Sequence, residues 1–269
     1  MATILRLNNA SFKGDLPNIN PFVNFGRLDF GFDFRERESK YLDLAGNHKL
    51  KVMKNDINNN EIHVEDETII DSLGGLGISP ILGFLEIDYE LNPIPIDGTE
   101  KFTLMFVGGQ HPSYVWDDID TAGSSASTSR FYDYGTVVSD SGFALTSRTI
   151  GRNHTRVVGQ DVLTDNLPSP QTPTVIFLTF DGDKFTMVNK TLGTSSSWSV
   201  STNGGLIDPI PVRNDYSNYV VVGHHHKSST LSAFPPAVYQ LARWNDILQP
   251  SEIEAQYQNT KMSFPSLGL

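Results

Sequence analysis

The sequence predicts an all-β fold closed by one short C-terminal helix. Apolar and polar residues alternate in many short segments, as in strands with one buried face. The clearest segment predicts a half-buried strand whose apolar face holds Leu28, Phe30, Phe32 and Phe34. About fourteen strand candidates stand against a single helical pattern near residue 250, and this balance is typical of an all-β protein.

The strand candidates follow one another between segments rich in Gly, Pro, Asn and Asp, which favour turns. After residue 28 we expect strands at 41–44, 50–53, 61–64, within 78–91, and at 102–107, 135–138, 143–147, 155–158, 175–180, 185–188, 219–222 and 238–243. The residues Asp181-Gly182-Asp183 predict a tight hairpin turn between two of these strands.

The helix candidate has a recognisable start. Pro250 suits a first helical position, and Glu252 stands three residues after Gln249, as in a capping box. Ile253 and Tyr257 are four residues apart and share one face. We therefore expect the chain to end in an amphipathic helix.

Length and composition favour one globular domain. A sandwich of 269 residues commonly forms a single domain. We expect an extended N-terminal arm over residues 1–27, because Asn, Gly and Pro recur there, and a single domain over residues 28–269.

The net charge of −11 makes nucleic acid a poor partner, because the mean field repels phosphate. The chain has no cysteine, so disulfides, thiolate metal sites and thiol nucleophiles are excluded. No segment approaches the roughly 20 apolar residues of a membrane span, and the N-terminus lacks the pattern of a signal peptide. We expect no membrane insertion.

Three segments follow one another in the second half of the chain, TVIFLTFDGDKFTMVNKTLG, YVVVGHHH and VYQLARWNDILQPSEIEAQY, with weaker counterparts earlier in SKYLDLAGNHKL and EKFTLMFVGG. In this order they resemble segments of the concanavalin-like and laminin-G-like lectin jelly rolls. Asn189-Lys190 replaces the usual Asn-Gly turn, and Gln249 replaces the capping serine. The resemblance implies a two-sheet antiparallel jelly-roll sandwich (concanavalin-like) with a short C-terminal helix, whose rim loops bind glycans, proteins or calcium in some relatives.

A long loop over residues 109–130 is the first candidate binding region, because long loops in compact domains are usually functional or mobile. Its aromatic and acidic residues suit sugar stacking and hard oxygen coordination, so calcium is the one cofactor left open. An alternative is a solvated loop with one aromatic anchor, since the EF-hand glycine and terminal glutamate are missing. The candidate ligand-binding residues here are Tyr114, Trp116, Asp117, Asp118 and Asp120.

Three consecutive histidines, His224, His225 and His226, form the second candidate region. Neighbouring residues on a strand alternate between faces, so at most two imidazoles would converge on one metal ion. We interpret them as part of a polar rim loop that contributes to ligand binding, and we assign no metal site. Trp198 and Trp244 are interpreted as core residues.

One motif suggests catalysis. Glu86-Ile87-Asp88-Tyr89-Glu90 resembles the Glu-x-Asp-x-Glu strand of family-16 glycoside hydrolases. The three acidic side chains would share a strand face, and a retaining pair of carboxyl groups needs about 5 to 5.5 Å. The alternative is the solvated face of an ordinary strand.

The sequence therefore predicts a non-enzymatic virion or surface structural protein that binds a glycan or protein partner through rim loops. The opening MATILRLNNASFKGDLP resembles the starts of some tailed-phage virion proteins, which implies tail receptor binding or capsid decoration, made in the host cytoplasm without a signal peptide. Expected partners are other virion proteins, further copies in a homo-oligomer, or a cell-surface glycan. The alternatives are a glycoside hydrolase that uses Glu86, Asp88 and Glu90, or a pure assembly protein without an external ligand.

Overall fold

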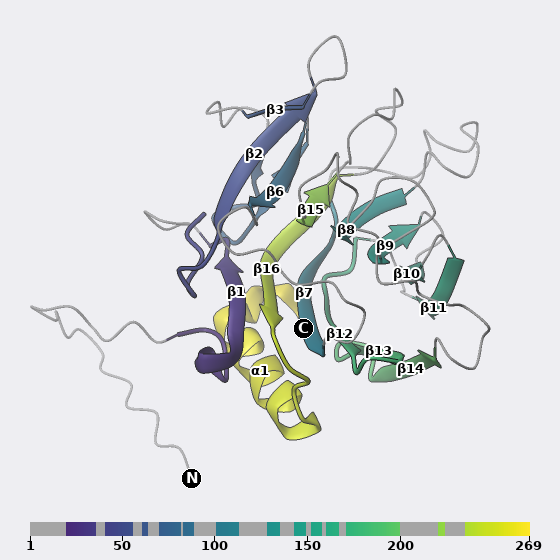
Figure 1. Cartoon of the computed structure of the whole chain (residues 1–269). Coiled ribbons are helices and arrows are strands. Elements are labelled where there is room, and N and C mark those ends of the chain that lie inside the picture. Colours follow the sequence, from purple (N-terminus) through teal and green to yellow (C-terminus); the bar gives the residue numbers. More distant parts are fainter. Residues whose placement is uncertain are drawn as a thin grey trace, which may run out of the picture.

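The protein is a sandwich of two antiparallel β-sheets with one α-helix, as a computed structural model shows (Figure 1). The structure describes residues 20–35, 41–55, 61–63, 70–81, 83–88, 101–112, 128–134, 143–148, 152–157, 160–166, 171–199, 220–223 and 235–269. Every strand pair among these residues is antiparallel. The all-β prediction with a short C-terminal helix is confirmed.

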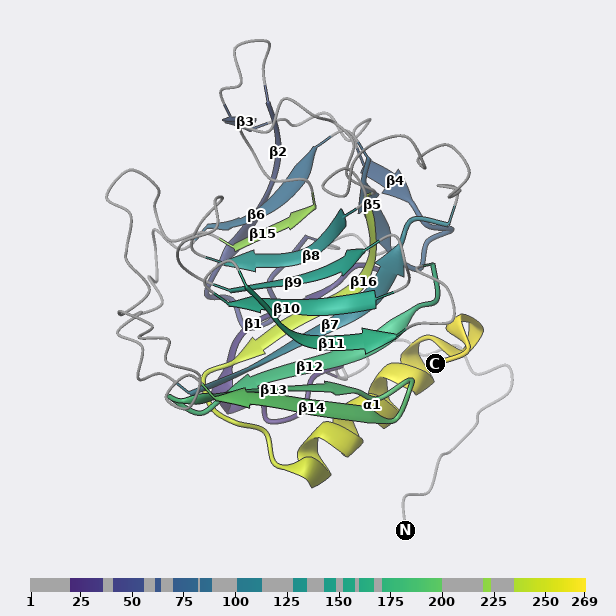
Figure 2. The ribbon, with the colours of Figure 1, turned by 90° about the vertical axis from the view of Figure 1, so that its right-hand side faces the viewer.

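In the described part of the chain each sheet contains eight strands, and we name the two sheets A and B. Sheet A has the order β14 (Thr194–Ser199), β13 (Lys184–Asn189), β12 (Thr174–Phe180), β7 (Phe102–Gln110), β16 (Pro236–Trp244), β5 (Ile78–Pro80) and β4 (Ile70–Ser72), and β1 (Leu28–Asp33) also pairs with β16. Sheet B has the order β11 (Gln160–Asn166), β10 (Arg152–Val157), β9 (Phe143–Arg148), β8 (Thr128–Tyr134), β15 (Val220–Gly223), β6 (Phe84–Asp88), β2 (Lys49–Asn55) and β3 (Glu61–His63). Figure 2 shows β6, β15 and β8 to β11 side by side across the face turned to the viewer.

The central strands of sheet A are buried on both faces. One core cluster, with Phe106, Leu178 and Leu241, lies between the two sheets. A second cluster, with Trp244 and Ile253, lies between sheet A and helix α1 (Pro250–Ser263). Consequently β7, β12 and β16 are buried along their whole length, and apolar residues predominate on both of their faces.

The prediction that one face of the first strand is exposed to solvent is wrong. Phe30, Phe32 and Phe34 do line the core between the sheets. Leu28 belongs to the second cluster instead, because the register of β1 against β16 shifts between Leu28 and Phe30. Asp33, on the other face, is also buried, so neither face of β1 is solvated.

The strand predicted at residues 41–44 is wrong, since this segment is a loop with one isolated bridge at Leu42. Its fold depends on Asp43, a buried carboxylate that accepts four backbone N–H groups. The donors are Gly31 (2.8 Å), Ala45 (3.0 Å), Asn47 (2.9 Å) and His48 (2.9 Å). Local hydrogen bonds of this kind compete with a strand ladder, and here they are stronger because the acceptor is charged.

The hairpin turn predicted at residues 181–183 is confirmed between β12 and β13. Asp181 Oδ1 accepts the N–H groups of Asp183 at 3.0 Å and Lys184 at 2.6 Å. Gly182 has φ 101°, a conformation that side chains disfavour. These backbone bonds hold the pKa of Asp181 below its usual range.

The predicted helix start is also confirmed. Pro250 is the first residue of α1, and Glu252 Oε2 accepts the Gln249 backbone N–H at 2.6 Å. The buried face contains Ile253, Gln256 and Thr260, whereas Tyr257 is half-buried. Two of the three buried residues are polar, which the apolar pattern does not indicate.

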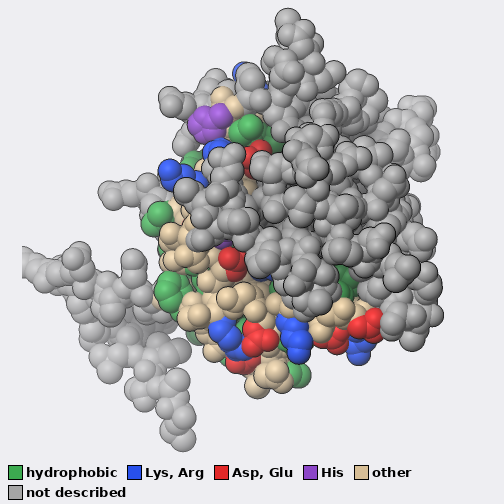
Figure 3. Space-filling model, in the orientation of Figure 1, with side chains coloured by type: hydrophobic (Ala, Val, Ile, Leu, Met, Phe, Trp, Pro, Cys, Tyr) green, Lys and Arg blue, Asp and Glu red, His purple; other side chains and the backbone are tan. Residues whose placement is uncertain are grey.

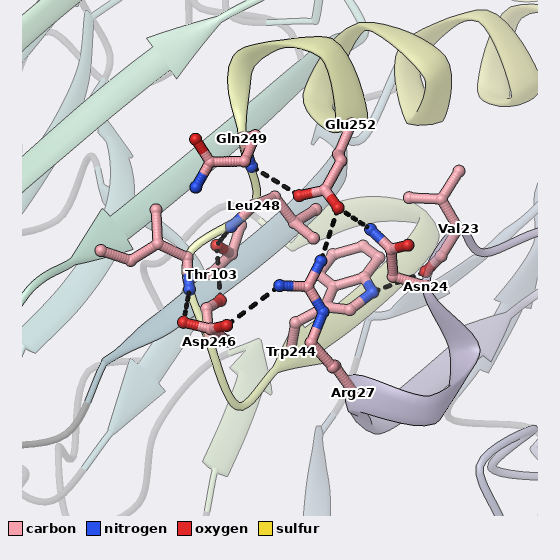
Figure 4. Close-up of polar contacts among 10 residues, drawn as sticks. Val23, Asn24, Arg27, Thr103, Trp244, Asp246, Leu248, Gln249 and Glu252 are labelled. Atoms are coloured by element: carbon pink, nitrogen blue, oxygen red, sulfur yellow. Dashed lines mark hydrogen bonds and ion pairs between the residues drawn. The ribbon is translucent and has the colours of Figure 1, made fainter.

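The segment that precedes β1 is fastened to the helix and to β16 (Figure 4). Arg27 bridges Asp246 at 3.0 Å and Glu252 at 2.6 Å. The indole N–H of the fully buried Trp244 donates to the Val23 carbonyl at 2.8 Å. Trp244 is therefore a core residue, as the sequence predicts.

The short 3-10 helices, η1 (Phe25–Arg27) and η5 (Pro265–Leu267), lie on the same side of sheet A as α1, because Arg27 pairs with Glu252 and Leu267 packs on the second cluster. No helix in the described part of the chain is long and apolar enough to cross a membrane.

Candidate functional site

The candidate ligand residues from the sequence fall in segments that the structure does not describe. Tyr114, Trp116, Asp117, Asp118 and Asp120 lie within 113–127, and the three histidines lie within 224–234. Their assignment as ligand residues stays a prediction, as does calcium. Among the described side chains, no three His, Asp or Glu residues gather in a way that could hold a metal ion.

The attachment points of these two segments nevertheless lie close together. The strands β8 and β15 are antiparallel neighbours, with Val221 opposite Asp133 and Val220 opposite Tyr134. Residues 113–127 enter β8 at its first residue, Thr128, and the histidines follow the last residue of β15, Gly223. In antiparallel neighbours the start of one strand and the end of the other lie at the same end of the sheet. Both candidate segments therefore join sheet B at one end, which we call the loop end.

The side chains of His111 and Asp71 contact each other close to the point where residues 113–127 begin. His111, directly after β7, is 5% exposed at its side chain, and its Nε2 lies 2.9 Å from Asp71 Oδ2. The His111 backbone N–H also donates to Pro235 at 3.0 Å. Sequence reasoning missed His111 and Asp71, since 40 residues separate them. They hold the chain in place where it leaves sheet A for residues 113–127.

Glu86 of the acidic motif stands on the outer face of sheet B, the face that points away from sheet A. Leu85 and Ile87 of β6 lie in the core between the sheets, so Glu86 stands on the opposite face. The register places Lys51 directly opposite Glu86, and Lys49 opposite Asp88. Glu90 lies outside the described residues. The catalytic assignment of Glu86, Asp88 and Glu90 therefore stays a prediction.

An ionic cluster between β1, β16 and the loop after residue 41 is structural. Asp29 lies 2.7 Å from Arg243 Nη1 and 3.2 Å from His48 Nε2, and these two partners are buried. Burial raises the pKa of Asp29, but the hydrogen bonds and charges of His48 and Arg243 outweigh it and bring the pKa below its ordinary value. Because its cationic and imidazole partners are inside the fold, this cluster offers little to a ligand.

Comparison with known proteins supports the fold without naming a family. No family model and no curated protein sequence matches the chain. Solved structures do match. The binding domain of botulinum neurotoxin serotype D has a TM-score of 0.59 and 10% identity over 87% of this chain. A botulinum neurotoxin DC binding domain in complex with rat synaptotagmin II has a TM-score of 0.54 and 9% identity, also over 87%.

A third similar structure is Trypanosoma rangeli sialidase in complex with sialic acid, with a TM-score of 0.55 and 11% identity over 88% of this chain. The chain spans about half of each toxin domain, at 52%, and 34% of the sialidase. At such low identity the likeness concerns the fold alone. The chain is thus a β-sandwich of jelly-roll type, similar in fold to binding domains.

Proposed function

We propose that this protein is a non-enzymatic binding domain that engages a glycan or a protein partner through sheet B and its loop end. The observation that carries the proposal is the difference between the two sheets. All described helices lie on the outer side of sheet A, so that sheet serves as a buried scaffold. The outer face of sheet B carries no described helix, and both candidate loops join its end.

The structural neighbours support a binding function. Two of them are named as binding domains of botulinum neurotoxins, one of serotype D and one in complex with rat synaptotagmin II. The third is a sialidase in complex with sialic acid. Fold alone does not determine function, so these names indicate which ligands to test first.

Within this function we propose a structural role in a virion, as a tail receptor-binding or capsid decoration protein that assembles with virion proteins or with its own copies. The resemblance of residues 1–17 to phage virion proteins supports the proposal. Mass spectrometry of purified particles tests it. Presence of the chain in stoichiometric amounts is expected, and its absence from particles would contradict the virion role.

A glycan array probed with the purified protein tests the binding function, with a pull-down from host-cell surface extract as the protein arm. We expect selective retention of a glycan class or of one surface protein. Silence in both assays, together with tight co-purification with particles, would instead indicate a pure assembly protein.

The rival function is glycoside hydrolysis through Glu86, Asp88 and Glu90. Its support is the position of Glu86 on an outer sheet face. However, a lysine directly opposite an acidic residue is also the ordinary arrangement of charges on a solvated strand face. We expect no release of reducing sugars from polysaccharides. Release that Glu86→Gln abolishes would replace our proposal with the hydrolase.

A further inference from the structure

The register of sheet B brings basic residues into two adjoining rows. In the first row, Thr128 of β8 pairs with Arg148 of β9, which pairs with Arg152 of β10, which pairs with Asn166 of β11. In the second row the corresponding residues are Arg130, Thr146, His154 and Thr164. Both rows lie at the loop end of the sheet, because the first contains the residue that begins β8.

Both rows belong to the outer face of sheet B. Val222 is buried in the core between the sheets, so its neighbour Val221 stands on the outer face. Val221 pairs with Asp133, and Asp133 pairs with Ala144. Residues two apart on a strand share a face, so Thr146 and Arg148 of β9 are on the same outer face as Ala144. The row residues that pair with them are on this face as well.

The sequence gives the same face assignment independently. Phe143 and Leu145 alternate with the outer-face positions of β9, and Leu145 pairs with Tyr132 and with Thr155. Val157 pairs with Phe143. By register, these apolar residues share the face opposite to that of the two rows.

The charge of these rows differs from that of the chain. The sequence has ten arginines, and Arg130, Arg148 and Arg152 occupy the two rows, whereas no carboxylate stands at the row positions on β8 to β11. Farther along the face, Arg156 does stand opposite an acid, Asp161. Arg148 and Arg152 are directly opposite each other, a placement that destabilises a sheet through like-charge repulsion. An anionic ligand would relieve that repulsion.

The surface around α1 shows the contrasting pattern. There Lys190 lies 2.6 Å from Glu254, and Arg27 bridges two acids. Figure 3 accordingly shows blue and red side chains interspersed near the lower edge of the molecule. The charged residues around α1 are therefore mixed in sign, whereas the arginines of the two rows have no acidic residue at the row positions.

We propose that the two basic rows bind the carboxylate of an acidic glycan, and this proposal rests on the binding function above. An arginine guanidinium presents a planar fork that matches a carboxylate with two hydrogen bonds. The flanking threonines and Asn166 provide the hydroxyl and amide groups that pair with sugar hydroxyls. Four neighbouring strands span about 14 Å, which suits a short oligosaccharide.

Nucleic acid fits these rows less well. Single-stranded nucleic acid needs aromatic platforms for its bases, and the row positions hold no Phe, Tyr or Trp. The net charge of −11 also opposes a long polyanion, while salt screens distant charges from a small ligand that reaches the arginines.

The test is calorimetric titration of the full chain with 3′-sialyllactose, with lactose as the neutral counterpart. We expect sialyllactose to bind and lactose to bind at least about tenfold more weakly. The double variant Arg148→Ala/Arg152→Ala should lower the affinity for sialyllactose about tenfold or more, since hydrogen bonds to a charged group are lost. Arg148→Lys/Arg152→Lys keeps the charge but not the fork, and should also bind more weakly than the wild type.

The matched control is Lys49→Ala/Lys51→Ala, which removes the same charge from the far strand of the same face. It should bind within about twofold of the wild type. Circular dichroism of every variant verifies that it is folded.

Three outcomes would overturn the proposal: equal affinity of wild type and Arg148→Ala/Arg152→Ala, equal affinity for lactose, or tighter binding of oligonucleotides than of sialyllactose. If the protein still retains a neutral glycan or a surface protein in these cases, the binding function stands and only the acidic-glycan site fails. If it retains nothing, both fail.

Discussion

Sheet A and sheet B are built from the same number of strands but are used differently. In sheet A the central strands are buried along their whole length, since sheet B covers one face and α1 with residues 20–27 covers the other. In sheet B, Leu85 and Ile87 of β6 lie in the core and alternate with Glu86, which leaves the other face for contacts outside the core. Sheet A therefore stabilises the fold, whereas the outer face of sheet B is the surface on which a binding site can form.

The largest effect should come from the covered side of sheet A. Trp244→Ala removes a fully buried indole and leaves the Val23 carbonyl without its 2.8 Å donor. We expect a loss of about 3 to 5 kcal/mol in the free energy of unfolding, measured with urea. Trp198, which is only partly buried, is the control, and its alanine variant should lose clearly less. Equal losses for the two variants would contradict a double-sided core in sheet A.

The next effect concerns the polar contacts under α1. Gln256 is fully buried, accepts the Val23 N–H at 2.8 Å and donates to the Pro21 carbonyl at 3.0 Å. Gln256→Ala leaves two backbone groups unsatisfied and should cost about 2 to 3 kcal/mol. The matched control is the exposed Gln258 of the same helix, whose alanine variant should change stability by no more than about 0.5 kcal/mol.

A smaller effect should follow pH at Asp29. Its pKa is lower in the folded protein than the ordinary 3.8 of the unfolded chain, because His48 and Arg243 favour the charged form more than burial disfavours it. The stability that it contributes is complete above about pH 3.8 and is lost as the pH falls through the lower folded pKa. Urea unfolding of the wild type should therefore weaken with acid more steeply than that of Asp29→Asn. Parallel pH profiles would contradict this assignment.

The smallest effect on stability is expected on the outer face of sheet B. Arg148→Ala/Arg152→Ala removes two like charges that stand opposite each other, so the free energy of unfolding should change by no more than about 0.5 kcal/mol. Urea unfolding measures it. A loss comparable with that of Trp244→Ala would mean that these arginines support the fold, which would remove the contrast between the sheets.

Much of the fold could be predicted from local patterns. The turn at Asp181 and the start of α1 at Pro250 are confirmed because turns and helix caps depend on neighbouring residues. The coverage of β1 could not be predicted, since Leu28 packs in a cluster with Trp244 and Ile253, more than 200 residues away. At residues 41–44, Asp43 stabilises a loop by accepting backbone N–H groups, which the alternation of apolar and polar residues does not predict.

The candidate site divides in the same way. Residue types indicated the loop around Trp116 and the three histidines, and the structure adds that their attachment points share one end of sheet B. The basic rows escaped sequence reasoning because Arg130, Arg148 and Arg152 become neighbours only through pairing across three strands. A register shift between Arg130 and Tyr132 further hides the face of Arg130 from simple alternation.

The most direct test of the division between the sheets is a map of amide chemical shifts during titration with 3′-sialyllactose. The account predicts perturbations at residues 128–130, 146–148 and 152–154, and in the adjoining loops, with the amides of β7, β12 and α1 unchanged. Perturbations centred on α1 and the covered side of sheet A would contradict it.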